Sequence, residues 1–498
     1  MLPMSTAWPW SSPACATSGI RLCRMILIVF LASALFFSAQ GSTIQAGADI
    51  QAAINAAKAG DTILVGPGDQ NSFEVDKPLT IVGQGGPVLH AVIQRPAIKI
   101  ICDGTTVSGF KILGVGKDSA AKFNYYMDNP AAAAGQRLDQ PNAAIVVSAN
   151  DVSVKNITIF GSQAGVQAEE ADNLLVQNAT LESCDSGVTL LRSSLCRLEN
   201  CRFSNCRKYG LNAEKCDDLK VQNSSFVSSD NAGFLLKESD GCQVQDNVFS
   251  GARFGLSLWN ASFNQVRRNR ADHNYYGILI TYNSNDNIIE DNVVEENRRN
   301  EIVKGFGIGI SLQENSSDNL LIRNTAKKNF NGLEVSKGCK LNVVFGNNAS
   351  ENNHGIRLNE NRNNLIFANN FYNNNINAYE NASLNIWNTT IGNYYSDYHG
   401  KDENGNGIGD QPYALPGQDS ESSDFQPLIK PYRDGGLNLT ALKEEVRRYA
   451  RYGPADEEIP PFRMSSGTIV ISSRVPTSPP KWSDSKPLDI NGGLGESS

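Results

Sequence analysis

Several residue types that mark familiar protein classes are scarce in this chain of 498 residues. Charged residues make up 19%, and acidic residues outnumber basic ones by 52 to 44, which gives a formal net charge of −8. A general nucleic-acid-binding protein needs a basic face, so this balance disfavours such a role. Beyond residue 41 only Met127 and Met464 remain, and the four His are far apart in the sequence. The sequence therefore shows no cluster of soft or imidazole metal ligands.

Cysteine is present but lacks any metal-binding spacing. The ten Cys include no C-x-x-C pair, so a zinc or iron–sulfur cluster is not expected. Five of them lie between Cys184 and Cys216. Disulfides are chemically permitted in an exported chain, and buried free thiols fit the same pattern. The sequence leaves both possibilities open.

Long hydrophobic runs are scarce as well. The one prominent run covers residues 25–37 (MILIVFLASALFF), follows Arg21 and Arg24, and ends in small or polar residues. It is shorter than the ~20 apolar residues of a transmembrane helix and predicts a secretory signal peptide over residues 1–41. An uncleaved N-terminal anchor is the alternative. We expect a mature protein without a membrane span that is secreted, periplasmic or at the cell surface.

Glycine and asparagine, in contrast, recur with a regular period. A Gly followed by alternating apolar residues returns every 22 or 23 residues, with one interval of 32. The set comprises Gly165, Gly187, Gly210, Gly233, Gly255, Gly277, Gly309, Gly332 and Gly355. Alternation predicts short strands, and a unit this short predicts one coil of a solenoid. The expected fold is all-β: a right-handed parallel β-helix, pectin-lyase-like, with coils of about 22 residues.

Asparagine follows the same repeat, and 34 Asn fall within residues 251–400. One Asn lies 13 to 15 residues after most repeat Gly: Asn156, Asn178, Asn200, Asn223, Asn247, Asn269, Asn292, Asn324, Asn347 and Asn369. Coils stack ~4.8 Å apart, so an Asn at a left-handed turn position can bond to its copies above and below. We therefore expect an inward-facing ladder. Glycan acceptors are expected outside the coils, at Asn388 and Asn438.

The repeat and its interruptions divide the chain into five parts. After the signal peptide, residues 42–96 hold an N-terminal cap and the first strands, with a short amphipathic helix within residues 48–64. The β-helix repeats cover 97–392 and include a loop excursion at 117–142. Residues 393–433 form a calcium-type loop and C-terminal cap. Residues 434–498 are expected to form a charged helix and a flexible tail.

The C-terminal cap contains a candidate metal site. Its sequence DENGNGIGD places oxygen-bearing residues at alternate positions around Gly407, a pattern that suits a hard cation such as Ca²⁺. The expected ligands are Asp402, Asn404, Asn406, the carbonyl of Ile408, and Asp410. The carboxylate of a helix–loop–helix calcium site is absent at position 12, where Tyr413 lies. An Asn/Gly-rich turn without metal is the alternative.

Three segments resemble one family of exported proteins. These are TIQAGADIQAAINAAKAGDTILVGPG, LTIVGQGGPVL and GNYYSDYHGKDENGNGIGDQPY. Over residues 42–432 the chain is similar to the NosD-like family of the carbohydrate-binding and sugar-hydrolase β-helix repeats. The resemblance implies a right-handed β-helix and a periplasmic or surface role. For the namesake it implies help in copper-site maturation of nitrous oxide reductase, with a membrane transporter complex as a partner.

Three functions fit this resemblance. The first is a non-catalytic binding or scaffold module for polysaccharide or a surface glycoprotein, with ligand-binding candidates Trp259, Tyr275, Tyr282, Arg267 and Arg268. The second is a polysaccharide lyase, epimerase or hydrolase, for which Asp272, His273 and Tyr275 are weak catalytic candidates. The third is copper-site maturation, which the scattered His and Met do not favour. The sequence inclines toward binding without catalysis.

One aromatic set bears on the first function. Tyr209, Phe254 and Tyr276 each precede a repeat Gly, so they should line up along one edge of the stack. An inward-facing aromatic stack that fills the core is the favoured interpretation, and an exposed sugar-binding edge is the alternative.

Overall fold

The computed structural model describes residues 41–92, 95–114, 142–297, 306–417 and 422–433, together with the backbone of 462–464 and 467–469. The predicted signal peptide lies outside the described residues, as do nearly all of the 117–142 excursion and of the 434–498 tail. The chain divides into two compact units, Met1–Ser42 and Thr43–Ser498, and the fold below belongs to the second.

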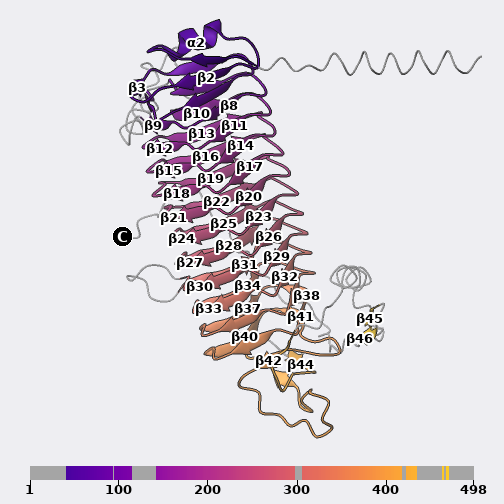
Figure 1. The fold of residues 1–498 in the computed structure, drawn as a ribbon. Helices are drawn as coiled ribbons and strands as arrows, with labels where there is room; N and C mark the ends of the chain where they lie inside the picture. The colour runs from indigo at the N-terminus through magenta and orange to yellow at the C-terminus, as the bar shows by residue number, and fades with distance from the viewer. Residues whose placement is uncertain are drawn as a thin grey trace, which may run out of the picture. The chain divides into compact units, whose positions relative to one another are not determined.

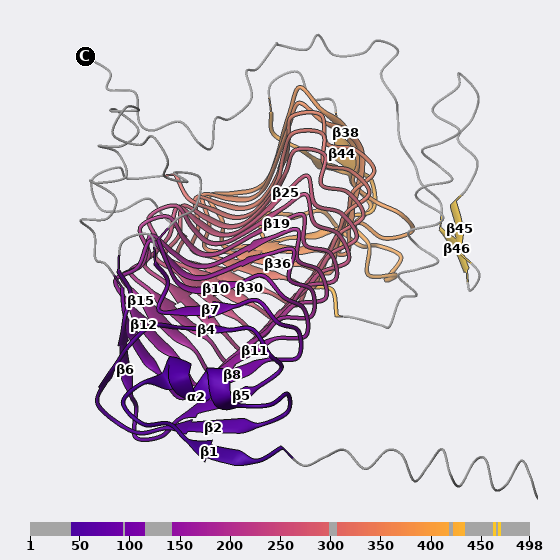
Figure 2. The same cartoon turned by 90° about the horizontal axis from the view of Figure 1, so that it is seen from above.

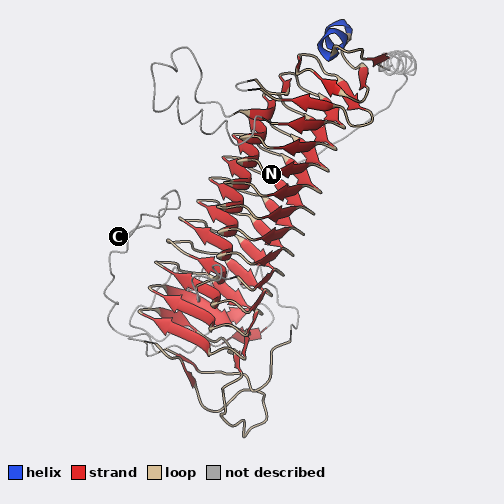
Figure 3. Cartoon of the chain, turned by 90° about the vertical axis from the view of Figure 1, so that its left-hand side faces the viewer, coloured by secondary structure: helices blue, strands red, loops and turns tan. Residues whose placement is uncertain are grey.

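The fold is a parallel β-solenoid built from three long sheets, as predicted (Figures 1 and 3). Most coils give one strand to each sheet, so hydrogen-bonded neighbours are usually three strands apart in sequence. Sheet A has 15 strands: β1 (Thr43–Gln45), β2 (Thr62–Val65), β5 (Thr80–Gly83), β8 (Thr106–Ser108), β11 (Ser153–Lys155), β14 (Leu175–Gln177), β17 (Arg197–Glu199), β20 (Lys220–Gln222), β23 (Gln243–Gln245), β26 (Gln265–Arg267), β29 (Ile288–Glu290), β32 (Leu320–Ile322), β35 (Val343–Phe345), β38 (Arg362–Phe367) and β41 (Leu384–Ile386).

The other two long sheets follow the same rule. Sheet B has 14 strands: β3 (Asp69–Gln70), β6 (Val88–His90), β9 (Lys111–Leu113), β12 (Thr158–Phe160), β15 (Thr180–Glu182), β18 (Arg202–Ser204), β21 (Ser225–Val227), β24 (Val248–Ser250), β27 (Arg270–Asp272), β30 (Val293–Glu295), β33 (Thr325–Lys327), β36 (Asn348–Ser350), β39 (Asn370–Tyr372) and β42 (Tyr394–Tyr395). Sheet C has 13 strands: β4 (Phe73–Val75), β7 (Ile98–Ile100), β10 (Ala143–Val147), β13 (Ala164–Glu169), β16 (Ser186–Leu191), β19 (Tyr209–Glu214), β22 (Ala232–Lys237), β25 (Phe254–Trp259), β28 (Tyr276–Thr281), β31 (Ile308–Leu312), β34 (Asn331–Ser336), β37 (His354–Asn359) and β40 (Ile376–Asn381).

Two short antiparallel pairs complete the described strands: β43 (Tyr413–Ala414) with β44 (Ser423–Asp424), and β45 (Phe462–Met464) with β46 (Gly467–Ile469). The predicted capping helix is confirmed as α2 (Ile50–Ala56). The side chain of Asp49 accepts a hydrogen bond from the backbone N–H of Ala52, which caps the helix N-terminus. Ile50 and Ile54 are buried, so the apolar face of α2 covers the first coils.

The interior is a single apolar column because the strands keep the same register from coil to coil. In sheet C, Leu256 pairs with Ile278 and Ile278 with Ile310, and all three are fully buried. Figure 2 shows the coils nested on one another in the view from above. The Gly of the repeat is required by this nesting, since a Cβ on Gly332 would lie 2.6 Å from the carbonyl oxygen of Gly355.

The Asn ladder is present in the C-terminal half of the stack. From Asn247 through Asn269, Asn292, Asn324, Asn347 and Asn369, each side-chain amide donates to the Oδ1 of the next at 2.9–3.1 Å. Two further buried Asn columns run parallel to it: Asn264, Asn287, Asn319 and Asn342 in one, and Asn274, Asn297 and Asn329 in the other.

The predicted ladder is wrong in the N-terminal half. Asn156, Asn178, Asn200 and Asn223 have the left-handed backbone, with φ between 52° and 55°, but they are exposed. A left-handed residue directs its side chain outward here, and the next residue takes the inward position, as Ser224 does when its N–H donates to Asn247 Oδ1 at 2.9 Å. The expectation of an exposed Asn388 is also wrong, because that residue is 1% exposed. Asn438 lies outside the described residues.

The cysteines occupy the same inward turn positions. The backbone N–H of Cys242 donates to Asn264 Oδ1 at 2.8 Å, so Cys242 begins one of the Asn columns. All eight Cys from residue 102 onward are free thiols, and seven of them are buried. Burial raises the pKa of Cys196 and Cys242 to about 12. Of the two possibilities left open by the sequence, the structure has free thiols.

Candidate functional site

Sheet C presents its outer face as regular columns of side chains. The aromatic residues that precede the repeat Gly lie on this face, because Tyr209, Phe254 and Tyr276 belong to one register column and to an apolar cluster separate from the interior core. The predicted alignment along one edge is therefore confirmed, and the favoured interpretation as inward-facing core residues is wrong.

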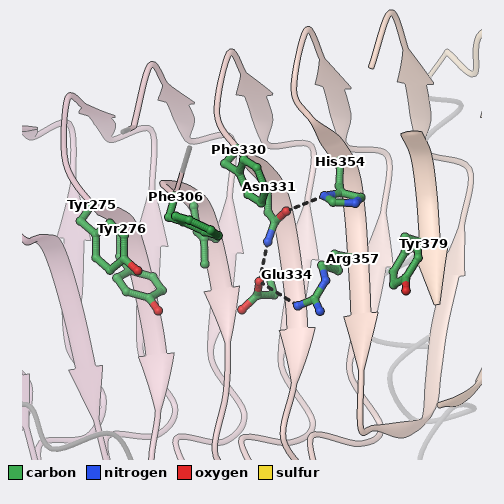
Figure 4. A pocket seen from close by; sticks show the side chains of 10 residues that line it. Tyr275, Tyr276, Phe306, Phe330, Asn331, Glu334, His354, Arg357 and Tyr379 are labelled. Carbon is green, nitrogen blue, oxygen red and sulfur yellow. Dashed lines mark hydrogen bonds and ion pairs between the residues drawn. The ribbon is translucent and has the colours of Figure 1, made fainter. Parts of the chain in front are cut away.

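The outer face of sheet C carries a pocket of about 490 Å³ near the C-terminal end of the stack. Five consecutive strands, β28, β31, β34, β37 and β40, contribute to it. At ~4.8 Å between strands, they span about 19 Å. The lining residues are Tyr275, Tyr276, Phe306, Ile308, Phe330, Asn331, Glu334, His354, Arg357 and Tyr379 (Figure 4).

The floor of the pocket is polar and connected by contacts between neighbouring strands. Asn331 and Glu334 of β34 pair in register with His354 and Arg357 of β37. Asn331 Nδ2 donates to Glu334 Oε2 at 2.6 Å, and Asn331 Oδ1 lies 2.9 Å from His354 Nδ1. Arg357 Nη1 lies 3.8 Å from Glu334 Oε2 (Figure 4).

Glu334 lies beneath this network rather than at its surface. Its side chain is only 8% exposed, and Oε1 accepts hydrogen bonds from Ser311 Oγ at 3.4 Å and Gln313 Nε2 at 3.3 Å. Burial raises the pKa of Glu334, and the nearby Arg357 guanidinium and the hydrogen bonds oppose that rise. Because its oxygens contact protein groups, Glu334 is suited to hold Asn331 and Arg357 in place.

The contact with Asn331 indicates which ring nitrogen of His354 carries the proton. Since the Asn331 amide nitrogen is directed to Glu334, its Oδ1 can only accept, and His354 Nδ1 must carry the proton. The Asn353 amide nitrogen also lies 3.1 Å from Nδ1, but one ring nitrogen cannot both donate and accept. The Asn353 amide is itself oriented, since its Oδ1 accepts from Asn375 Nδ2 at 3.0 Å. We assign Nδ1–H to the Asn331 contact because it is the shorter of the two, 2.9 Å against 3.1 Å, and because the Glu334 carboxylate holds the Asn331 amide at 2.6 Å. Burial, with a smaller contribution from Arg357, lowers the pKa of His354, so the ring is neutral near pH 7.

Aromatic rings form the walls around this floor. The His354 ring lies 5.8 Å from Phe330 and 5.5 Å from Tyr379, and Arg357 is 5.9 Å from the Tyr379 centroid. At the other end Tyr275 and Tyr276 meet edge to face at 4.9 Å. Burial raises the pKa of Tyr276, which keeps its hydroxyl protonated. An apolar-walled hollow with a few convergent polar groups is the usual form of a small-molecule or sugar site.

The predicted catalytic candidates fall in two places. Tyr275 lines the pocket, whereas Asp272 and His273 lie at the end of β27 in sheet B. His273 Nδ1 is 3.0 Å from Asp272 Oδ1, and its Nε2 is 3.4 Å from Glu296 Oε2. Burial alone would raise the pKa of Asp272, but hydrogen bonds from Ser250, His273 and Arg270 lower it overall. Both side chains are thus engaged in a local ion-pair network.

The ligand-binding candidates are likewise separated. Trp259 and Tyr282 stack with ring centroids 4.1 Å apart, at the opposite ends of β25 and β28 from the pocket tyrosines. Arg267 lies in sheet A, where its Nε is 2.9 Å from Glu290, and Arg268 pairs with Asp246 at 2.7 Å. Of the five candidates, only Tyr275 reaches the pocket.

The predicted metal loop is compact and internally bonded. Asp402 accepts from the backbone N–H groups of Asn406 at 3.1 Å and Gly407 at 2.9 Å, and the Asn406 side chain accepts from Ile408 N at 2.8 Å. The Asp410 carboxylate accepts from Glu403 N at 2.7 Å. Neither in this loop nor in the other described residues do three or more His, Cys, Asp or Glu side chains lie close enough together to hold a metal ion.

Sequence reasoning missed Asn331, Glu334, His354 and Arg357. The signal was present, because each pair occupies the positions one before and two after a repeat Gly, at Gly332 and Gly355. In the earlier coils the position before the Gly is Ala, Ser, Tyr, Phe or Ile, so the change to Asn and then His marks the polar floor. In the described residues, no helix is long and apolar enough to cross a membrane.

Comparisons with known proteins agree on the fold. Residues 227–400 match the family described as periplasmic copper-binding protein (NosD), and residues 142–294 match the right handed beta helix region. No curated protein matches the sequence significantly.

Solved structures with a similar fold have low sequence identity to this chain. They include the Dettilon tailspike protein (13% identity, 59% of this chain and 60% of that chain covered, TM-score 0.48) and the A-module of the mannuronan C-5 epimerase AlgE6 from Azotobacter vinelandii (12%, 70% and 96%, 0.43). A third is the family 28 exopolygalacturonase of Yersinia enterocolitica (11%, 70% and 79%, 0.45). At these identities and TM-scores the likeness supports no statement about the function of this chain.

Proposed function

Because this chain belongs to the NosD-like family of right-handed β-helix proteins, we propose that it is an exported protein that binds an extended polysaccharide along the outer face of sheet C. The family description as periplasmic supports export. The polymer is a free polysaccharide or the glycan of a surface glycoprotein, since both present the same chemistry to this face.

One observation carries the proposal: the aromatic-walled pocket with a polar floor, built across five consecutive strands of sheet C. The faces of sugar rings pack on aromatic side chains, and their hydroxyl groups need hydrogen-bonding partners between those packing surfaces. The aromatic packing surfaces are provided by Tyr275, Phe306, Phe330 and Tyr379. The hydrogen-bonding partners are provided by the Asn331–His354 pair. Phe306 is 55% exposed and its ring lies 5.1 Å from that of Phe330, so the two rings form part of an exposed aromatic surface at the pocket.

The direct test is binding of a panel of polysaccharides measured by isothermal titration calorimetry. Tyr379→Ala removes an aromatic wall and should weaken binding at least tenfold. Tyr282→Ala, which truncates an aromatic residue outside the pocket, should leave affinity unchanged. Binding that is lost equally in both variants, or no binding to any polymer, would contradict the proposal.

The C-terminal loop supports a second ligand, and we propose Ca²⁺ bound by Asp402, Asn404, Asn406, Asp410 and the carbonyl of Ile408. The donor set is all oxygen, as a hard cation requires, with two carboxylates and two neutral amides. The amides favour a modest affinity of the extracellular range. A rise in melting temperature at millimolar Ca²⁺ that disappears in Asp402→Ala is the expected result, and no shift would refute the site.

The alternative role in copper-site maturation, with a membrane transporter complex as partner, has less support. His90, His273, His354 and His399 are the only His of the chain, and His90 and His273 each contact an Asp. A stoichiometric, tight copper titration would favour it over the polysaccharide proposal.

A further inference from the structure

Two side chains that line the pocket have polar atoms without a hydrogen-bond partner among the described residues. His354 Nδ1–H is occupied by Asn331, so the lone pair of the neutral ring is on Nε2, and no described polar group lies within hydrogen-bonding distance of that atom. A neutral imidazole held in one tautomer by an amide is arranged to accept a proton. Asn331 and Glu334 act here as positioning residues for His354.

Arg357 is the second such group. Among the described residues its ion-pair partner is Glu334, and the 3.8 Å separation is too long for a hydrogen bond. The guanidinium therefore keeps its N–H donors available, and its side chain is 33% exposed at the mouth of the pocket, above the buried carboxylate. A planar fork of donors of this kind matches a carboxylate, which it can bind through two parallel hydrogen bonds.

The composition of the pocket disfavours glycoside hydrolysis. That reaction uses two carboxyl groups on either side of the scissile bond, about 5 Å or 6.5–9.5 Å apart. Of the described residues that line the pocket, Glu334 is the one carboxylate, and its contacts are all with protein groups. A base beside a carboxylate-binding arginine suits a different step, the removal of a proton from the carbon next to a carboxylate.

Resting on the proposed polysaccharide face, we propose that this pocket binds a uronate residue of an acidic polysaccharide and exchanges the proton on the carbon that bears its carboxylate. Arg357 binds the carboxylate, and His354 Nε2 takes the proton. The C–H electron pair moves into the carboxylate as an enediolate, which the guanidinium stabilises. Return of a proton from the imidazolium, after exchange with water, completes the step without any co-reactant.

The fate of the enediolate has two balanced outcomes. Return of the proton from His354 to the face it left restores the same uronate. Protonation of the opposite face by water inverts the configuration, and the His354 imidazolium then gives its proton to the hydroxide that remains. Expulsion of the neighbouring glycosidic oxygen as an alcohol, which takes up one proton, gives a chain end with a carbon–carbon double bond. Both begin with the same C–H cleavage, so the test is directed at that cleavage.

The experiment is hydrogen exchange in D₂O with polygalacturonate and polymannuronate, and with dextran as the neutral control. Deuterium at the carbon next to the carboxylate is measured by NMR, chain cleavage by the ultraviolet absorbance of the unsaturated product, and binding by calorimetry in parallel. We expect exchange in the acidic polymers only. The rate should rise with pH as His354 loses its proton, with a midpoint below the ordinary His pKa of about 6.5 because the pKa of His354 is lowered by burial.

Two pocket variants and one control separate the roles. His354→Gln should slow exchange by about 100-fold or more while acidic polymer still binds. Arg357→Gln should weaken binding of the acidic polymers. His273→Gln, which removes the imidazole bound between Asp272 and Glu296, should leave exchange unchanged.

The outcomes distinguish this inference from the function on which it rests. Tight binding of an acidic polymer with exchange no faster than in buffer, or equal exchange in His354→Gln, overturns the inference and leaves polysaccharide binding intact. Binding of neutral polymers alone also overturns it. Failure to bind any polymer overturns both.

Discussion

Replacing one Asn of the buried ladder tests how the C-terminal coils are held together. Asn324 is fully buried, and its Nδ2 donates to Ile289 O at 2.8 Å and to Asn347 Oδ1 at 3.0 Å. Its Oδ1 accepts from the backbone N–H and the side-chain Nδ2 of Asn292, both at 3.0 Å. Asn324→Leu keeps a branched side chain of similar length and removes all four hydrogen bonds.

The expected cost follows from these contacts. Each hydrogen bond contributes about 1 kcal/mol net, so four contribute about 4 kcal/mol. Burying the Leu side chain returns about 1–2 kcal/mol, because apolar surface is removed from water. We therefore expect the free energy of unfolding to fall by at least about 2–3 kcal/mol, since the buried backbone N–H of Asn292 also loses its acceptor.

The assay is urea denaturation followed by circular dichroism, with Asn178→Gly as the matched control. Asn178 is an exposed Asn with φ 53°, which Gly adopts without strain, and its side chain makes one contact, to Asn156 at 3.1 Å. The control should change stability by less than about 0.5 kcal/mol, as surface substitutions usually do. A loss below about 1 kcal/mol in Asn324→Leu, or equal losses in both variants, would refute the assignment of the ladder as the main polar support of these coils.

Three further predictions concern other parts of the fold. Asp424 is fully buried at the C-terminal cap, where burial raises its pKa to about 7. Between about pH 4 and pH 7 the Asp424 carboxyl group is therefore protonated in the native state and ionised in the unfolded chain. The stability of the wild type relative to Asp424→Asn should thus fall as pH rises from about 4 to about 7 in melting experiments, and parallel curves would contradict this. Alkylation of the native protein at pH 8 should modify Cys102, which is partly exposed, before any of the seven buried thiols, and mass spectrometry showing Cys242 modified first would contradict the burial. Gly332→Ala should lower the free energy of unfolding by about 1–3 kcal/mol, because its Cβ would meet the Gly355 carbonyl oxygen. The control Gly66→Ala should be tolerated, because no atom lies within 4 Å of the added Cβ. Equal denaturation midpoints in the two variants would contradict the close approach of the coils.

The fold was predictable because its causes repeat along the sequence. A Gly at the close approaches of the coils, an apolar alternation for each strand and an Asn at or next to the inward turn recur with one period. Each coil therefore repeats the evidence of the coil before it. The errors arose where two adjacent positions have different requirements. Asn suits both the left-handed turn residue and the buried residue after it, and only the structure separates Asn223, which is exposed, from Asn247, which is buried.

The candidate site was harder to predict because its residues meet through the stack. Tyr276 and Tyr379 are 103 residues apart in sequence, yet they line one pocket because register pairs every coil with the next. The sequence prediction instead selected Asp272 and His273 because they are adjacent in sequence, and in the structure they form a local ion-pair network in sheet B. Columns of residues at a fixed offset from the repeat Gly are the better guide in a solenoid, and they single out His354 and Arg357.

The central claim is that the outer face of sheet C, over β28 to β40, binds an acidic polysaccharide. A crystal structure of the protein with an oligouronate tests it most directly. We predict density for sugar rings against Tyr379 and Phe330, with a ring carboxylate within hydrogen-bonding distance of Arg357. Ordered sugar bound only elsewhere, such as on sheet A beside Arg267, would contradict the claim.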